Sequence, residues 1–320
     1  MAEPHNVFGA IIFWLYIVFA LVFIFLAIES ILRLPNRVPR KHVATFTVLA
    51  FISFSNLSFN MLNVLIDSYS TWSECKLPPA RLSLPSLWQW SVTSTLFRNF
   101  GEAIVQDEAR FLWTQSALMA TMSVSFFMST QGLRQRVPRL WAFFALSQIL
   151  PISFAQNLFY IALLRSPNVK GSSVVLPRTS TLVILNAYCA CLFVAPYTAR
   201  GPSLMPTILA ARLLLFVPSF LSQPLDLKEG RSSSQERAFF TQRQAQLAVA
   251  VYAVLMTVKQ LASIAFQGFA LSQILMALVS HPAVTSLGFD FLVTAISFST
   301  WSFIQDESGQ QSISPPKKEE

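Results

Sequence analysis

Charged residues are scarce in this chain: Asp, Glu, Lys and Arg together make up 12% of its 320 residues. An average soluble domain carries about 25%, so there is too little polar surface to surround a globule in water. A soluble enzyme is therefore excluded. An extended disordered protein is excluded as well, because 53% of the residues are hydrophobic and only 9 are Gly. The composition predicts an all-α fold, a polytopic transmembrane helix bundle.

Cysteine and histidine are too few to build the usual reactive or metal-binding sites. Three cysteines exclude a disulfide scaffold or a cysteine-rich metal module, and the three histidines are scattered in termini and loops. No GxSxG, HExxH, Walker or GxGxxG pattern occurs, which argues against a serine hydrolase, a metalloprotease and a nucleotide-driven pump. No DDxxD sequence for magnesium and diphosphate is present either. We expect no metal and no cofactor.

The formal net charge is +8. In a membrane protein such an excess collects in cytoplasmic loops and meets anionic lipid headgroups, so we expect membrane lipid as a partner and no nucleic acid.

Eight apolar segments predict the layout of the chain, because a spanning helix needs about 20 mostly apolar residues. They lie at 7–28, 43–66, 111–130, 140–164, 179–199, 203–221, 245–266 and 283–304. The fourth is interrupted by Pro151, which predicts a kink closed by neighbouring polar groups. Residues 72–106 mix tryptophan with charge and are expected to be interfacial or re-entrant. We expect seven to nine spans in a single domain, 1–304, with a polar loop at 223–243 and a polar cytosolic tail at 305–320.

The two ends of the chain give conflicting predictions of orientation. Basic residues after the first segment place that flank in the cytosol and the N-terminus in the lumen. The tail ends KKEE, in which Lys317 and Lys318 match the dilysine pattern that ER-retrieval machinery reads in the cytosol. Eight crossings would leave this tail in the lumen. Either one of the eight segments does not cross, or residues 72–106 do.

Four acids are the candidate catalytic residues, because ionisable groups inside a membrane are costly and mark function. Asp290 is the deepest, about seven residues inside the last segment. Glu102, Asp107 and Glu108 cluster before the third segment and become the better candidates if the acid lies at the lumenal mouth.

Each acid also has a purely structural interpretation. Asp290 could pair with Lys259 or Arg212, which lie in apolar segments themselves. Glu102 could form a helical ion pair with Arg98, four residues earlier. Asp107 and Glu108, beside Arg110, could simply begin a solvated helix.

Amide side chains are the candidate substrate-binding groups. They occur repeatedly within the apolar segments, where they form either interhelical hydrogen bonds or a polar pocket. The selected residues are Asn60, Asn63, Gln115, Gln156, Asn157 and Asn186. Aromatic residues reach 13%, and aromatic faces stabilise cations. A water-free cavity with aromatic walls and one protonated carboxylic acid suits chemistry through a carbocation.

Three segments together resemble the fungal integral-membrane terpene cyclases of meroterpenoid biosynthesis, of the ascochlorin and ascofuranone type. They read WTQSALMATMSVSFFM at 113–128, SQILPISFAQNLFYIALL at 147–164 and SHPAVTSLGFDF at 280–291. The resemblance implies an all-helical enzyme that protonates an epoxide or alkene of a farnesylated aromatic compound and closes rings through a carbocation, without metal or diphosphate. Its implied partner is a prenylated aromatic small molecule, and its implied location is the endoplasmic reticulum membrane. The alternatives are a small-molecule or lipid transporter and a non-catalytic membrane scaffold.

Overall fold

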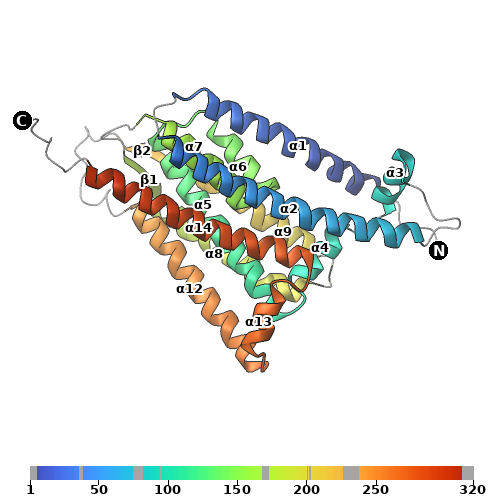
Figure 1. Ribbon diagram of the computed structural model, residues 1–320. Helices are drawn as coiled ribbons and strands as arrows, with labels where there is room; N and C mark the ends of the chain where they lie inside the picture. Colours follow the sequence, from blue (N-terminus) through green and yellow to red (C-terminus); the bar gives the residue numbers. More distant parts are fainter. Residues whose placement is uncertain are drawn as a thin grey trace, which may run out of the picture.

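The computed structural model describes residues 6–35, 39–74, 82–93, 96–167, 173–199, 201, 203–225 and 238–311. Helices make up nearly all of these residues, and most of them lie side by side along one direction (Figure 1). The prediction of an all-α helix bundle is confirmed.

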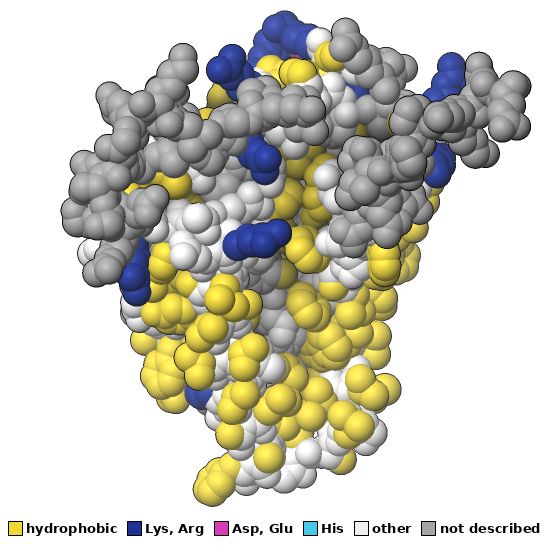
Figure 2. Space-filling view, turned by 90° about the vertical axis from the view of Figure 1, so that its left-hand side faces the viewer, with side chains coloured by type: hydrophobic (Ala, Val, Ile, Leu, Met, Phe, Trp, Pro, Cys, Tyr) yellow, Lys and Arg dark blue, Asp and Glu magenta, His cyan; other side chains and the backbone are white. Residues whose placement is uncertain are grey.

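The two ends of the bundle differ in charge. We call the end where α14 (Pro282–Gln311) finishes the basic end, and the end where α14 begins the acidic end. Around the basic end lie Arg33, Arg40, Lys41, Arg134, Arg136, Arg139, Arg165, Arg178 and Arg243, and Figure 2 shows basic side chains scattered over this face. Around the acidic end lie Asp67, Glu74, Glu102, Asp107 and Glu108.

Seven helical segments among the described residues run between these two ends. They are α1 (Val7–Leu32), α2 (Arg40–Glu74), α5 (Glu108–Arg134), α8 (Arg178–Thr198), α9 (Leu204–Leu214) continued by α10 (Val217–Leu221), α12 (Gln242–Phe266) and α14. Their direction follows from contacts: the Gln131 amide of α5 bonds Gln242 at the basic end, and Gln260 of α12 bonds Glu108 at the acidic end. Trp301 of α14 then lies against Phe46 near the start of α2.

The segment 140–164 does not run the length of the bundle. Arg139, which precedes α6 (Leu140–Ile149), pairs with Glu29 near the end of α1. Arg165, which ends α7 (Ile152–Arg165), bonds the Ile31 carbonyl at the same basic end. The chain therefore enters the bundle in α6, turns at Leu150–Pro151 and returns in α7. The prediction of a kinked span is wrong here: the segment is a re-entrant helical hairpin.

The described residues of the segment 72–106 also stay at one end. Helix α3 (Leu84–Thr93) packs on the first half of α1, where the Trp14 indole N–H donates to Ser91. The Trp90 indole donates to Ser68 of α2, and α4 (Leu96–Ile104) leads into α5 at the acidic end. Neither the segment 140–164 nor the described part of 72–106 thus contains a helix that runs the length of the bundle.

In the described part of the chain, five helices are long and apolar enough to cross a membrane: α1, α2, α8, α12 and the 282–305 part of α14. Their outward faces carry large apolar side chains such as Phe8, Phe51 and Leu255. Helix α5 is longer than α8 but carries more hydroxyl and amide groups. It can do so because it lies inside the bundle, in contact with α12, α14, α6 and α7.

A small antiparallel sheet covers part of the basic end. Strand β1 (Ser173–Pro177) lies between β2 (Gln223–Leu225) and β3 (Phe239–Thr241). The sequence predicts only a polar loop at 223–243, and that prediction misses both edge strands. Their three-residue length leaves too little alternating pattern to recognise. Thr241 then starts α12 through a capping box with Gln244.

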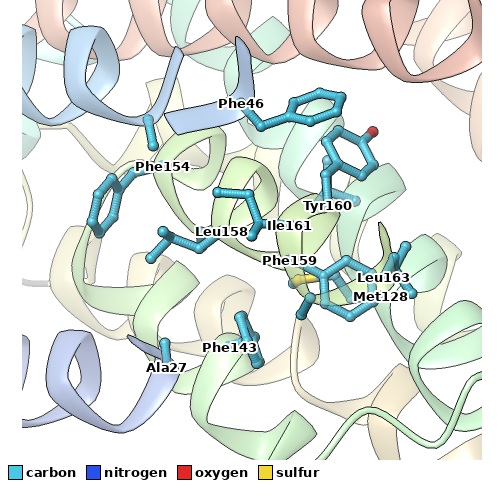
Figure 3. Packing of buried hydrophobic residues seen from close by; sticks show 14 of the residues in the cluster. Ala27, Phe46, Met128, Phe143, Phe154, Leu158, Phe159, Tyr160, Ile161 and Leu163 are labelled. Carbon is cyan, nitrogen blue, oxygen red and sulfur yellow. The ribbon is translucent and has the colours of Figure 1, made fainter. Parts of the chain in front are cut away.

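An aromatic cluster fills the core near the basic end. The rings of Tyr160 and Trp301 stack with centroids 4.6 Å apart, and the ring centroid of Phe46 lies 5.0 Å from that of Tyr160. Phe127 packs edge-on against both members of the stack. Figure 3 shows Phe46 and Tyr160 side by side beneath α14. This cluster, Phe46, Phe127, Tyr160 and Trp301, is called the aromatic plug below.

We expect Trp301→Ala to destabilise the folded bundle by about 3–5 kcal/mol, because it removes a buried ring and leaves a cavity in the plug. Thermal unfolding in lipid nanodiscs measures this. Phe303→Ala is the matched control: Phe303 lies two residues away on α14 but is 73% exposed, against 7% for Trp301. Its replacement should change stability by less than about 0.5 kcal/mol. Equal losses in the two variants would contradict the packing described here.

Candidate functional site: the hairpin tip

The turn between α6 and α7 leaves backbone groups without helical partners in the middle of the bundle. Helix α6 ends at Ile149, and Pro151 has no N–H with which to continue the hydrogen bonds. Side chains from other helices donate hydrogen bonds to two carbonyls at this end. A guanidinium N–H of Arg212 donates to the Gln148 carbonyl, and the Tyr16 hydroxyl donates to the Ile149 carbonyl.

Asp290 accepts hydrogen bonds from the first backbone N–H groups of α7. The N–H groups of Ile152 and Ser153 each donate to its carboxyl group at 2.9 Å, and the Ser153 hydroxyl donates to it as well. The Ser153 hydroxyl also lies within hydrogen-bond distance of Ser53 on α2. Pro151, which occupies the N-cap position, has no side-chain oxygen for this purpose. Asp290 is therefore the cap of α7, supplied from another helix.

The residues that bond the tip lie at the same depth on three helices. Tyr16 lies nine residues into α1, Arg212 eight residues into α9 and Asp290 eight residues into α14, all counted from the acidic end. At 1.5 Å per residue, each lies about 12–14 Å along its helix. The hairpin thus reaches deep into the apolar interior, where non-helical backbone persists only when its polar groups are bonded.

The structural role of Asp290 is to cap α7, whereas the sequence suggests an ion pair with Lys259 or Arg212. Arg212 binds a carbonyl of α6. Lys259 lies near the amide oxygen of Gln260, at 3.5 Å, and over the ring of Phe193. Neither base pairs with Asp290, and no other cation among the described residues does so. Asp290 is 8% exposed and bonds only to uncharged donors.

Several buried polar atoms at the tip and on α5, which packs against α6 and α7, have no hydrogen-bond partner. Both polar atoms of the Gln115 amide lack a hydrogen-bond partner, as do the side-chain oxygens of Gln148, Gln156 and Asn157. Each of these side chains is less than 10% exposed. A buried polar group without a partner costs about 1–3 kcal/mol. Such a concentration around one acid marks the place where the bundle can accept water or a polar ligand.

Three of the six predicted substrate-binding amides belong to this region: Gln115, Gln156 and Asn157. Asn60 is buried, but its amide N–H₂ is bonded to the backbone and side chain of Asn56 in its own helix. Asn63 is half-buried on α2. Asn186 is exposed on the outside of α8 and donates to the Leu182 carbonyl, so the prediction that it lines the site is wrong. Its spacing in the sequence could not reveal which side of α8 faces the bundle.

The other candidate acids lie at the acidic end, apart from the tip. Asp107 is the N-cap of α5: it accepts the Arg110 backbone N–H at 2.8 Å and pairs with the Arg110 guanidinium at 3.2 Å. Glu108 accepts a hydrogen bond from the buried amide of Gln260. The solvated helix start expected for this pair is thus only partly correct, since Glu108 is tied into the bundle.

Glu102 is half-buried on α4, and the side chain of Arg98, its predicted ion-pair partner, lies outside the described residues. A hollow of about 330 Å³ opens beside Asp107, lined also by Arg110, Phe269 and Gln273. The α4–α5 segment packs against Ala283, seven residues before Asp290 on α14, so this end and the tip are separate places.

Hydroxyl side chains are the site residues that sequence reasoning missed. Ser153 holds Asp290, and Thr294 and Ser297 follow Asp290 on the same face of α14 with unpaired oxygens. Their spacing from Asp290, four and seven residues, is a helical signal that could have identified them. Serine and threonine are so frequent in this chain that the signal does not stand out.

No protein-family model, curated protein or solved structure matches the chain. Among the described residues, no group of three His, Cys, Asp or Glu side chains could hold a metal ion.

Ser153→Ala should destabilise the bundle by about 1–3 kcal/mol, because Asp290 loses one donor and Ser53 loses its buried partner. The measurement is thermal or chemical unfolding in a defined detergent. Ser286→Ala is the control, since Ser286 is equally buried on α14 but bonds only the Ala283 carbonyl of its own helix. The control should lose less than about 1 kcal/mol. A Ser286 variant as unstable as the Ser153 variant would refute the capping role.

Proposed function

We propose that this chain is a membrane-bound terpene cyclase in which Asp290 protonates an epoxide or alkene of a farnesylated aromatic compound and rings close through a carbocation. One observation carries the proposal. Of the three segments on which the resemblance to such cyclases rests, 147–164 and 280–291 meet at the hairpin tip, and 113–128 lies on α5, which packs against α7 and α14. They contribute Gln115, then Ser153, Gln156 and Asn157, and then Asp290.

The hydrogen bonds of Asp290 leave room for a transferable proton. Its Oδ1 accepts two hydrogen bonds, from the backbone and the hydroxyl of Ser153, whereas Oδ2 accepts one, from Ile152. A neutral carboxylic acid can accept all three and still carry its proton on Oδ2. The same bonds hold the group in one orientation, which proton transfer to a positioned substrate requires.

The surroundings suit a substrate with an apolar tail and a polar head. A farnesyl chain partitions into the bilayer with about 0.8 kcal/mol per buried CH₂ and would approach from lipid. An apolar hollow of about 380 Å³ between α1 and α3, lined by Trp14 and Trp88, is a suitable place for it to leave the bilayer. The unpaired amides of Gln115 and Gln148 would receive the phenolic head.

The remaining acids receive secondary roles in this proposal. Asp107 and Glu108 already hold the start of α5 and the amide of Gln260, and a role in stability suffices for both. Glu102 remains the competing proton donor, and its variant belongs in the same assay. The proposed reaction starts by protonation, not by loss of diphosphate, so it calls for no metal.

The proposed orientation places the basic end in the cytosol, following the excess of Lys and Arg there. With the hairpin re-entrant, seven segments would cross and α14 would end on the cytosolic side, the side that an ER-retrieval signal requires. Lys317 and Lys318, the expected signal, lie outside the described residues. We therefore propose the endoplasmic reticulum membrane as the location.

A transporter is the second candidate, and the re-entrant hairpin favours it, because broken helices at mid-membrane often hold transported ions or solutes. Here the helix ends that would bind such a solute are already bonded to Tyr16, Arg212 and Asp290. The cyclase is the better supported of the two.

The test supplies farnesylated phenols and their terminal epoxides to microsomes that contain this protein, with EDTA present. A cyclised product should form. Asp290→Asn should lower its rate at least about 100-fold, since general acids contribute 10²–10⁴-fold. Glu102→Gln and the lipid-facing control Ser299→Ala should keep most of the activity.

Thermal unfolding of each variant separates loss of chemistry from loss of fold. Asp290→Glu, which restores a carboxyl group, should recover part of the rate. Loss of activity in Glu102→Gln but not in Asp290→Asn would show that the proton donor lies at the acidic end. Unchanged substrate with folded wild-type protein would reject the cyclase, and a flux assay in vesicles would then test the transporter.

A further inference from the structure

A row of buried oxygens runs from Asp290 toward the basic end, along the interface of α7 and α14. Two contacts anchor the interface: Ser153 bonds Asp290 at one end, and Tyr160 stacks on Trp301 at the other. Between them lie Gln156 and Asn157 on α7 and Thr294 and Ser297 on α14. We call these four residues the polar strip.

Helical spacing shows that the strip is continuous. On α7, Ser153, Gln156, Asn157 and Tyr160 fall at positions i, i+3, i+4 and i+7, which share one face of a helix. On α14, Asp290, Thr294, Ser297 and Trp301 fall at i, i+4, i+7 and i+11 and share a face in the same way. Because both ends of these two faces touch, the residues between them face the same interface.

Every member of the strip has an oxygen without a partner. These are the side-chain amide oxygens of Gln156 and Asn157 and the hydroxyls of Thr294 and Ser297. All four residues are at most 5% exposed. The amide nitrogens are occupied, by the Tyr160 hydroxyl and the Ser153 carbonyl. What remains is two amide oxygens, which only accept hydrogen bonds, and two hydroxyls, which can both donate and accept.

The two hydroxyls on α14 behave unlike the others of this helix. Five described hydroxyls of α14 donate to a carbonyl about one turn earlier, namely those of Thr285, Ser286, Ser299, Thr300 and Ser302. Thr294 and Ser297 do not. Buried water typically bonds two to four such groups, and it can donate to the amide oxygens while it accepts from the hydroxyls.

We propose that internal water fills the polar strip and forms a proton relay between Asp290 and the Tyr160 hydroxyl. The aromatic plug closes its far end, so the relay is internal and does not open to the basic end. Asp290 and Ser297 are seven residues apart on α14, about 10 Å, which is too far for direct transfer and is bridged by a few waters.

The relay rests on the proposed function, because it returns the proton that cyclisation consumes. The O–H bond of Asp290 breaks as a new bond forms to the epoxide oxygen or alkene carbon. The final cation is quenched when a C–H or phenol O–H bond breaks and its proton passes to the strip water beside Asp290. An O–H bond of that water then breaks as the O–H bond of Asp290 forms again, and the other waters of the strip share the excess proton in between. No proton is gained or lost.

The kinetic test compares a first turnover with continuous turnover. In the double variant Thr294→Val/Ser297→Ala, the first turnover should keep its wild-type rate, because Asp290 starts with its proton. Steady-state turnover should fall at least about tenfold, so a burst of product should appear. The control Ser299→Ala/Thr300→Val changes the same residue types on the same helix, where both hydroxyls bond their own backbone. It should show neither a slower steady state nor a burst.

A structural test stands independently of activity. A cryo-electron microscopy map detailed enough to show water should reveal ordered water bonded to Asn157, Thr294 and Ser297 in the wild type, and less of it in the double variant. A dry strip, or equal slowing of first and later turnovers, would overturn the relay and leave the cyclase intact. Water in the strip of a protein that cyclises no substrate would instead reject the proposed function.

Discussion

Hydrogen-bond satisfaction at the hairpin tip is the constraint on which the rest of the structure depends. A chain that turns back inside an apolar bundle exposes backbone N–H and C=O groups where no solvent can bond them. Tyr16, Arg212 and Asp290 bond these groups from three different helices. The tip therefore sets the position of α1, α9 and α14 relative to one another, and it explains why a carboxyl group and a guanidinium group are kept in the interior.

The same arrangement divides the interior around Asp290 into two regions. Beside the tip lies the unpaired amide oxygen of Gln148, and toward the basic end lies the polar strip, closed by the aromatic plug. In the proposed function, Asp290 lies between the substrate and the water of the strip and passes protons from one to the other.

Much of the fold could be predicted from the sequence, and the site only in part. Runs of apolar residues predict the helices closely, because each run needs only its own composition to be recognised. The prediction failed at 140–164, where apolar length suggests a span and the contacts of Arg139 and Arg165 show a hairpin. For the site, depth in a segment identified Asp290, whereas Asn186 was chosen by residue type alone and lies on the outside of α8.

The sequence by itself determined the class of the protein, its helical segments, its charge asymmetry and the presence of one deep acid. These depend on composition and on order along the chain. Only the tertiary structure decided that α6 and α7 enter and leave at one end, that Asp290 caps a helix and does not pair with a base, and that α7 and α14 pack together so that Ser153 meets Asp290 and Tyr160 meets Trp301. These contacts join residues more than a hundred positions apart. The local sequence pattern cannot predict them, because it does not show which helix a side chain will contact.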